Sequence, residues 1–228
     1  MDFSNTLQTV LIYALPVLFA ITVHEAAHGY AARHFGDNTA WMLGRITLNP
    51  LKHIDPVGTI LMPALMYVST VALPGGPFLL GYAKPVPVRF GSLRNPKRDM
   101  IWVAFAGPGA NFLQAIVWGI LFIVLHRIGV DEDFFLKMAS AGVSVNLALG
   151  VFNLFPLPPL DGGRVAVGVL PWKYGQYLAR LEPYGFFIMI ALIVFKVMGP
   201  LWMDPMMKLA SVGLNVLLFP VIWLLSYL

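Results

Sequence analysis

The chain has 228 residues, of which 58% are apolar and only 11% are charged. An average soluble domain is about 25% charged, so the composition excludes a soluble protein and indicates an integral protein of the lipid bilayer. The net charge is only +4, and the 15 Lys and Arg residues are scattered between apolar blocks, which excludes a nucleic-acid-binding domain. The absence of cysteine excludes disulfides, thiolate metal sites and cysteine nucleophiles.

Apolar blocks along the chain predict its membrane spans. A bilayer core of about 30 Å needs about 20 helical residues, and six blocks are candidates: residues 7–32, 57–73, 100–125, 134–155, 185–198 and 205–228. The second block carries Pro63, and the fifth is short. We therefore expect an all-α polytopic membrane protein with about five to six transmembrane helices.

The blocks form one unit, because no repeat or soluble appendage separates them. We expect a single membrane domain over residues 1–228, with a core at 7–170 and C-terminal helices at 183–228. The first five residues lack the basic region of a signal peptide.

A proline-rich tract lies between the second and third blocks. Pro85 and Pro87 interrupt helical hydrogen bonding, so residues 82–88 are expected to be extended. Extended chain at membrane depth is tolerated only where it packs on protein or lines a wet cavity. We therefore expect a re-entrant extended or β segment around residues 74–90, and the sequence leaves open whether residues 57–73 cross the membrane or re-enter.

The first block contains His24, Glu25 and His28 in an HExxH pattern. Histidines at i and i+4 share one helix face and can bind one metal ion together. In zinc metallopeptidases the glutamate of this pattern acts as general base. The alternative is a buried polar cluster that only fixes helix packing. Ionisable groups inside an apolar helix are costly and are functional by default, which favours the metal site.

A zinc site needs at least three protein ligands. Asp161 is the best third candidate, because it follows the fourth block on a turn that is rich in proline and glycine. The alternative role for Asp161 is an N-cap of a short helix starting near Gly162. Four other residues are rival ligands, of which His53 is the strongest: His34, His53, Asp55 and His126.

Three motifs together resemble the site-2 proteases, the intramembrane zinc metalloproteases of peptidase family M50. They are His24 to His28, Gly107 to Asn111, and Asn153 to Gly163, in the order that the family shows. The resemblance implies that His24, His28 and Asp161 bind one Zn²⁺ and that Glu25 activates water. It also implies substrate contacts for Asn111 and Asn153, with Asn153 helping to hold the substrate backbone or the oxyanion during catalysis.

The resemblance carries further expectations about domains and partners. Many members have a PDZ or a CBS domain, and this sequence contains neither, so regulation is expected to be absent or to come from a separate partner. The expected substrate is a transmembrane protein trimmed beforehand by another protease, or the remnant of a signal peptide. The tract at residues 81–88 resembles a family segment that pairs with an extended substrate by β-addition.

The metal site and the charges together predict a topology. His28 and Asp161 must lie at one membrane depth, which requires residues 57–98 to enter and return on the same side. That arrangement divides the 15 Lys and Arg residues 11 to 4, and the positive-inside rule makes the richer side cytoplasmic. We therefore expect an outside N-terminus, a cytoplasmic C-terminus and an active site nearer the cytoplasmic face.

The sequence thus predicts a zinc metalloendopeptidase that hydrolyses peptide bonds within or near transmembrane segments. The alternative is a membrane metal-binding transporter or a non-catalytic scaffold, because intramembrane His and Asp also mark ion pathways. Transport gives no reason for a glutamate directly after the first ligand, whereas hydrolysis requires one.

Overall fold

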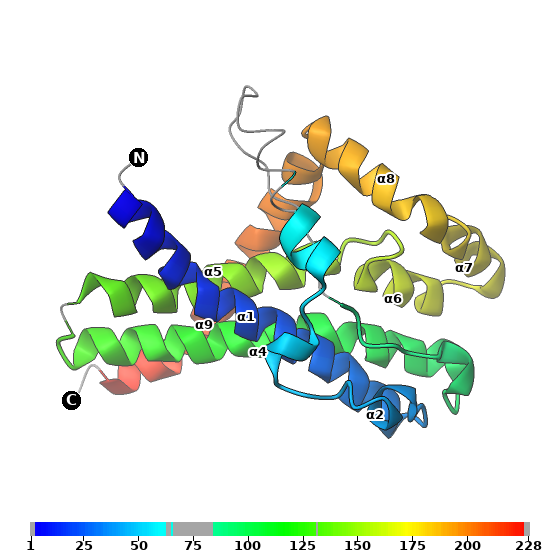
Figure 1. The fold of residues 1–228 in the computed structure, drawn as a ribbon, viewed down its shortest axis with the longest axis horizontal. Helices are drawn as coiled ribbons and strands as arrows, with labels where there is room; N and C mark the ends of the chain where they lie inside the picture. Colours follow the sequence, from blue (N-terminus) through cyan, green and yellow to red (C-terminus); the bar gives the residue numbers. More distant parts are fainter. Residues whose placement is uncertain (1–2, 63–64, 66–83, 131, 226–228) are drawn as a thin grey trace.

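The computed structural model describes residues 3–62, 65, 84–130 and 132–225. Within these ranges the regular structure is entirely helical (Figure 1). The four longest helices are α1 (Phe3–His34), α4 (Pro96–Arg127), α5 (Asp133–Asn153) and α9 (Asp204–Leu225). Each corresponds to one of the long apolar blocks, so the helical fold class predicted from the blocks is confirmed.

Shorter elements connect the long helices. The helical ones are α2 (Thr39–Met42), α6 (Asp161–Val169), α7 (Trp172–Ala179) and α8 (Glu182–Val194). Single 3₁₀ turns cover Pro50–Lys52 and Phe90–Ser92, and π-helical turns cover Pro56–Leu61 and Gly199–Met203.

Four helices of the described chain are long and apolar enough to cross a membrane, or five if the bent pair α7–α8 counts as one span. The upper of these two counts equals the lower end of the predicted five to six. The fifth block forms the 13-residue α8, which is bent by 68° from α7. The second block, residues 57–73, lies largely outside the described residues. Large apolar side chains such as Leu113 and Val117 are about two-thirds exposed, at 66% and 65%, as expected of a surface solvated by lipid.

The directions of the helices follow from their contacts. The Asn111 amide of α4 donates to Ala20 O of α1, and the Arg94 amide before α4 donates to Phe35 O after α1. Residues from one end of α1 therefore meet residues from the opposite end of α4, so α1 and α4 are antiparallel. The short loop between α4 and α5 makes these two helices antiparallel as well (Figure 1).

The last helix, α9, runs parallel to α4. Trp202, just before α9, donates to Val151 O near the end of α5, while Leu218 lies against Gly119 in the last third of α4. The start of α1 and the end of α9 consequently lie at the same end of the bundle (Figure 1). The prediction of opposite sides of the membrane for the two termini had assumed that the short fifth block crosses the bilayer, and that block forms the 13-residue α8, bent by 68° from α7.

The described part of the proline-rich tract is extended. Residues 84–89 have no helical structure and run beside the loop that follows α2. The Lys84 amide donates to His53 O at 2.9 Å, and the Arg45 guanidinium donates to Lys84 O at 2.9 Å and Pro85 O at 3.3 Å. Residues 74–83, where the re-entrant tip was predicted, lie outside the described residues, and no strand occurs in the ranges that the structure describes.

A buried aspartate fastens the extended segment to the end of α1. The Asp37 carboxylate is 1% exposed and accepts from Thr39 N at 2.9 Å, Thr39 Oγ1 at 2.6 Å and Arg89 N at 2.6 Å. Burial alone would raise the pKa of Asp37, but these hydrogen bonds outweigh it and lower the pKa below its ordinary value. The carboxylate therefore holds two distant segments together in its ionised form.

Candidate metal centre

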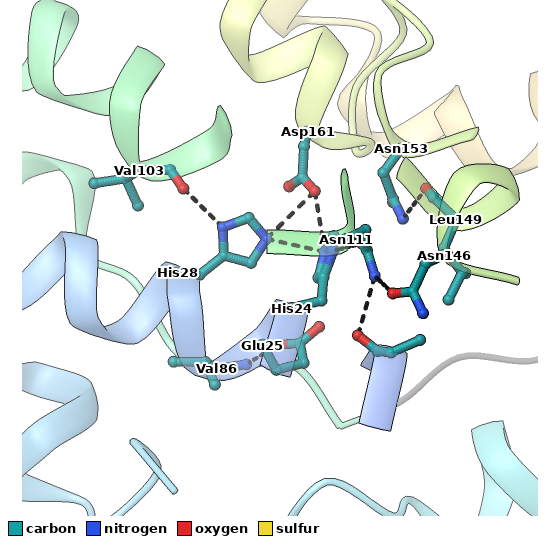
Figure 2. A network of polar contacts seen from close by, with 11 residues as sticks. His24, Glu25, His28, Val86, Val103, Asn111, Asn146, Leu149, Asn153 and Asp161 are labelled. Atoms are coloured by element: carbon teal, nitrogen blue, oxygen red, sulfur yellow. Dashed lines mark hydrogen bonds and ion pairs between the residues drawn. The ribbon is translucent and has the colours of Figure 1, made fainter. Parts of the chain in front are cut away.

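Three predicted ligands, His24 and His28 of α1 and Asp161 of α6, point toward one another (Figure 2). The two Nε2 atoms are 3.1 Å apart, and Asp161 Oδ2 lies 3.2 Å from His24 Nε2 and 3.3 Å from His28 Nε2. The three side chains are buried, with exposed fractions of 8%, 9% and 8%. They are the only such group of three His, Cys, Asp or Glu residues in the described part of the chain.

The position of the proton on His28 follows from its other ring nitrogen. His28 Nδ1 lies 2.7 Å from Val103 O of α4. A carbonyl oxygen can only accept, so Nδ1 carries the hydrogen. In the neutral ring, Nε2 then has a lone pair, and this lone pair faces Asp161 and His24.

The His24 ring is oriented in the same sense by a side chain. Its Nδ1 lies 2.6 Å from Asn111 Oδ1. The Asn111 amide nitrogen is already directed toward Ala20 O at 3.2 Å and Asn146 Oδ1 at 3.0 Å. The oxygen of Asn111 therefore faces the ring, Nδ1 of His24 donates, and its Nε2 also presents a lone pair.

Three acceptors thus converge in a buried space. Asp161 Oδ2 has no hydrogen-bond partner, and two neutral Nε2 atoms have no proton to share with it. Such a group of acceptors requires a cation, because facing lone pairs repel one another.

The spacing of these acceptors fits zinc. Tetrahedral ligands at about 2.0–2.1 Å from Zn²⁺ are roughly 3.3 Å from each other, and the observed separations are 3.1, 3.2 and 3.3 Å. Two imidazoles and one carboxylate also form a usual catalytic donor set, which leaves a fourth position for water or substrate. The residues present therefore fit a zinc ion.

Glycines allow the elements to approach closely enough to form the group. A Cβ at Gly107 of α4 would collide with the rings of both His28 and His24. On the other side, a Cβ at Gly162 would collide with Leu154 O, and one at Gly163 with the backbone at Pro158. Glycine at these positions lets α4 pack on the two imidazoles and lets the first turn of α6 pack against the turn that precedes it.

Glu25 lies beside the group on the next face of α1 (Figure 2). Its Oε2 accepts a hydrogen bond of 2.7 Å from the Val86 amide of the extended segment. This contact joins the extended segment directly to the residue predicted as general base. Gly29, one helical turn after Glu25, lies close to Val86, since a Cβ there would be 3.2 Å from Val86 Cγ1.

The predicted asparagines occupy different surroundings. Asn153 is the last residue of α5, is only partly buried, and donates to Leu149 O at 3.0 Å. Asn111 is fully buried between α1, α4 and α5, with both ends of its amide bonded within the protein. The geometry therefore favours a contact with the ligand His24 over a contact with substrate for Asn111.

The rival ligands lie apart from the group. His53 Nε2 donates to Thr47 O at 2.9 Å, and Asp55 accepts from the amides of Val57 and Gly58 at the start of a π-helical turn. The rings of His34 and His126 pack on neighbouring phenylalanines.

Sequence reasoning missed three partners: Val103 O, the Val86 amide and Asn146. The first two are backbone groups, and no side chain signals them. Asn146 was detectable as an amide inside an apolar block.

The chain is similar to known proteins over most of its length. The profile of peptidase family M50 matches residues 130–196. The chain is 36% identical over 198 residues to "Putative zinc metalloprotease YwhC" of Bacillus subtilis (strain 168), covering 83% of this chain and 82% of that protein. It is 30% identical over 181 residues to "Putative zinc metalloprotease Rip2" of Mycolicibacterium smegmatis, covering 78% of this chain and 64% of that protein. No solved structure matches the chain.

A polytopic helical membrane protein with two histidines and an aspartate around one point, and a glutamate beside them, is of the membrane metallopeptidase class. The similarity to YwhC extends this from class to family. The chain belongs to peptidase family M50, the site-2 proteases. The predictions of this family and of a zinc metalloprotease are therefore confirmed through family membership.

Proposed function

We propose that the protein hydrolyses peptide bonds within or near transmembrane segments of other membrane proteins, as one membrane domain over residues 1–228. One observation carries the proposal: the buried acceptors of His24, His28 and Asp161 converge beside Glu25. Glu25 and the two histidines belong to the long apolar helix α1. Ionisable groups are costly at membrane depth, so their convergence there indicates chemistry within the bilayer.

His24, His28 and Asp161 would hold one Zn²⁺. The bound ion supplies Lewis acidity, which polarises a carbonyl and makes water a stronger nucleophile. Glu25 takes a proton from the attacking water while the water oxygen bonds to the scissile carbonyl carbon. The carboxyl of Glu25 then donates that proton to the leaving amine as the carbon–nitrogen bond breaks.

The extended segment is proposed to align the substrate. A helical peptide bond is shielded by its own hydrogen bonds, so the substrate must unwind before hydrolysis. Residues 84–89 are extended and touch Glu25 through Val86, so a substrate strand beside them would lie next to the general base. Asn153, at the end of α5, is proposed to contact the substrate backbone or the oxyanion.

Charge distribution supports an orientation in the membrane. Arg127 and Lys137 flank the turn between α4 and α5. Arg33, Arg94, Lys97 and Arg98 lie at the opposite end, where α1 ends and α4 begins. We propose that this charged end is cytoplasmic, that the metal centre lies nearer to it, and that the N-terminus is outside. The direction of α9 supports the proposal that the end of the described chain, Leu225, is outside as well.

The proposed substrates are single-pass membrane proteins that another protease has already trimmed, and a separate protein is proposed to regulate access. Water must reach the centre, and the proline- and glycine-rich tract at residues 155–163 contains the proposed ligand Asp161.

Membranes from cells that produce either the wild type or Glu25→Gln provide the test. Peptides with cut ends inside hydrophobic segments should appear in mass spectra only with the wild type. Equal peptide sets from two folded, zinc-loaded proteins would contradict hydrolysis and favour the metal transporter or the scaffold.

A further inference from the structure

A chain of side-chain amides extends from the metal centre into the interior of the bundle. Asn111 of α4 and Asn146 of α5 are both 0% exposed. The Asn146 amide donates to Gly142 O at 2.9 Å, the Asn111 amide donates to Asn146 Oδ1 at 3.0 Å, and Asn111 Oδ1 faces His24 Nδ1 at 2.6 Å (Figure 2).

Backbone carbonyls fix the direction of each hydrogen bond in the series from Asn146 through Asn111 to His24. Gly142 O can only accept, so Asn146 must present its NH₂ group there and its oxygen toward Asn111. Ala20 O, 3.2 Å from the Asn111 nitrogen, imposes the same direction a second time. Asn111 can then offer only its oxygen to His24, and the ring must place a hydrogen on Nδ1.

We propose that Asn111 and Asn146 are positioning residues that fix His24 as the tautomer with hydrogen on Nδ1 and a lone pair on Nε2. The inference rests on the proposed zinc site, because the tautomer matters where Nε2 binds a metal. Simple helix–helix adhesion would be served by either direction of the amides. The observed direction is the one that gives a metal ligand.

Outer partners of ligating histidines orient the ring and raise its basicity, and their loss costs about 10–100-fold in metal affinity. Asn111→Leu removes the acceptor for Nδ1–H and is expected to weaken zinc binding by about that factor. Asn146→Leu should weaken it by only a few-fold, because Ala20 O still orients Asn111. Since Asn146 acts through Asn111, the double variant should bind zinc no more weakly than Asn111→Leu alone.

The experiment measures zinc affinity by chelator competition in the full-length protein in lipid nanodiscs. Matched controls are Gln114→Leu in α4, whose buried amide nitrogen has no partner, and Ser144→Ala in α5, which bonds only within its own helix. Both controls should bind zinc as the wild type does. Unchanged affinity in Asn111→Leu, or additive losses in the double variant, would overturn the inference.

A second measurement reads the tautomer directly. Nitrogen NMR of histidine-labelled protein without metal should find the His24 hydrogen on Nδ1 in the wild type, and hydrogen on Nε2 should appear in Asn111→Leu. If that variant does not fold, Asn111→Asp replaces it; this variant keeps an oxygen opposite the ring and should retain Nδ1–H. Hydrogen on Nε2 in the wild type would contradict the inference.

The two proposals fail separately. A wild type that binds no zinc contradicts the proposed function, while the NMR result still decides the tautomer. A wild type that binds zinc and hydrolyses substrate, with an unchanged affinity in Asn111→Leu, contradicts only the positioning role.

Discussion

His24 and His28 reach the same ring orientation by different routes. The His28 ring donates to a backbone carbonyl, Val103 O, whereas the His24 ring donates to the Asn111 side chain, which Asn146 supports from behind. Backbone support depends only on how closely α4 packs on α1, and no side-chain substitution at Val103 removes the carbonyl. Side-chain support can be removed by one substitution. Support by a backbone carbonyl cannot be recognised in the sequence, whereas support by a side chain is visible as asparagines within apolar helices.

Removing either histidine should weaken zinc binding, whichever group supports its ring. His24→Ala and His28→Ala should each weaken zinc binding by more than about 100-fold, because even outer partners cost about 10–100-fold. Zinc content per purified protein measures the loss. The control is Glu25→Gln, which should retain zinc. Stoichiometric zinc in either alanine variant would show that the ion binds elsewhere.

Both histidines should respond together to Gly107→Ala. The added methyl group would collide with both rings, so zinc affinity should fall by at least about 10-fold and stability by about 1–3 kcal/mol. Chelator competition and thermal unfolding measure the two effects.

The matched control for Gly107→Ala is Gly109→Ala on the same helix. A Cβ at Gly109 meets nothing closer than 3.5 Å, so this variant should behave as the wild type. Equal behaviour of the two variants would mean that close packing of α4 does not support the rings.

A substitution at Val86 should leave the three proposed metal ligands intact and disturb only Glu25. Val86 stands between Pro85 and Pro87, so Val86→Pro fits the extended backbone and removes the amide that donates to Glu25. Turnover should fall by about 10-fold, a part of the roughly 10²–10⁴-fold that general acid–base catalysis supplies, while zinc content stays unchanged. Val86→Ala keeps the amide and is the control. Equal turnover in the two variants would remove the amide from the mechanism.

The last prediction concerns Asp37, far from both histidines, where we expect an effect on stability and none on zinc binding. Asp37→Asn should lower stability at pH 7 by about 1–3 kcal/mol, since a buried charged acceptor is lost. The pKa of Asp37 is lowered by folding, so the ionised group stabilises the protein above the ordinary aspartate pKa of about 4, and this contribution is lost as the pH falls further.

Thermal unfolding of Asp37→Asn against pH measures this dependence. The difference from the wild type should shrink toward acid pH, and the exposed Asp133→Asn should change little at any pH. A difference for Asp37→Asn that is independent of pH would contradict the role of the charge.

Local spacing predicted more of this molecule than long-range geometry did. The i, i+4 pattern indicated that His24 and His28 share a face, and apolar length indicated α1, α4, α5 and α9 to within a few residues. The direction of α9 was not predictable, because it depends on whether the short fifth block crosses the membrane. Its contacts show that the chain begins α9 at the end where α5 finishes.

In the metal centre, too, local features were predictable from the sequence and long-range contacts were not. Asp161 was selected because a carboxylate followed a proline- and glycine-rich turn, which is a local signal. The donation of His28 to Val103 O depends on the packing of two helices 75 residues apart in sequence, and no residue type encodes it. Asn146 was accessible in principle, because a polar amide in a membrane helix needs an internal partner.

The most direct test of the metal centre is X-ray absorption at the zinc edge of the purified wild type. The account predicts one zinc per chain, with imidazole nitrogen and carboxylate oxygen ligands at about 2.0–2.1 Å, and loss of this signal in Asp161→Ala. A protein that binds no zinc, or a spectrum that Asp161→Ala leaves unchanged, would contradict it.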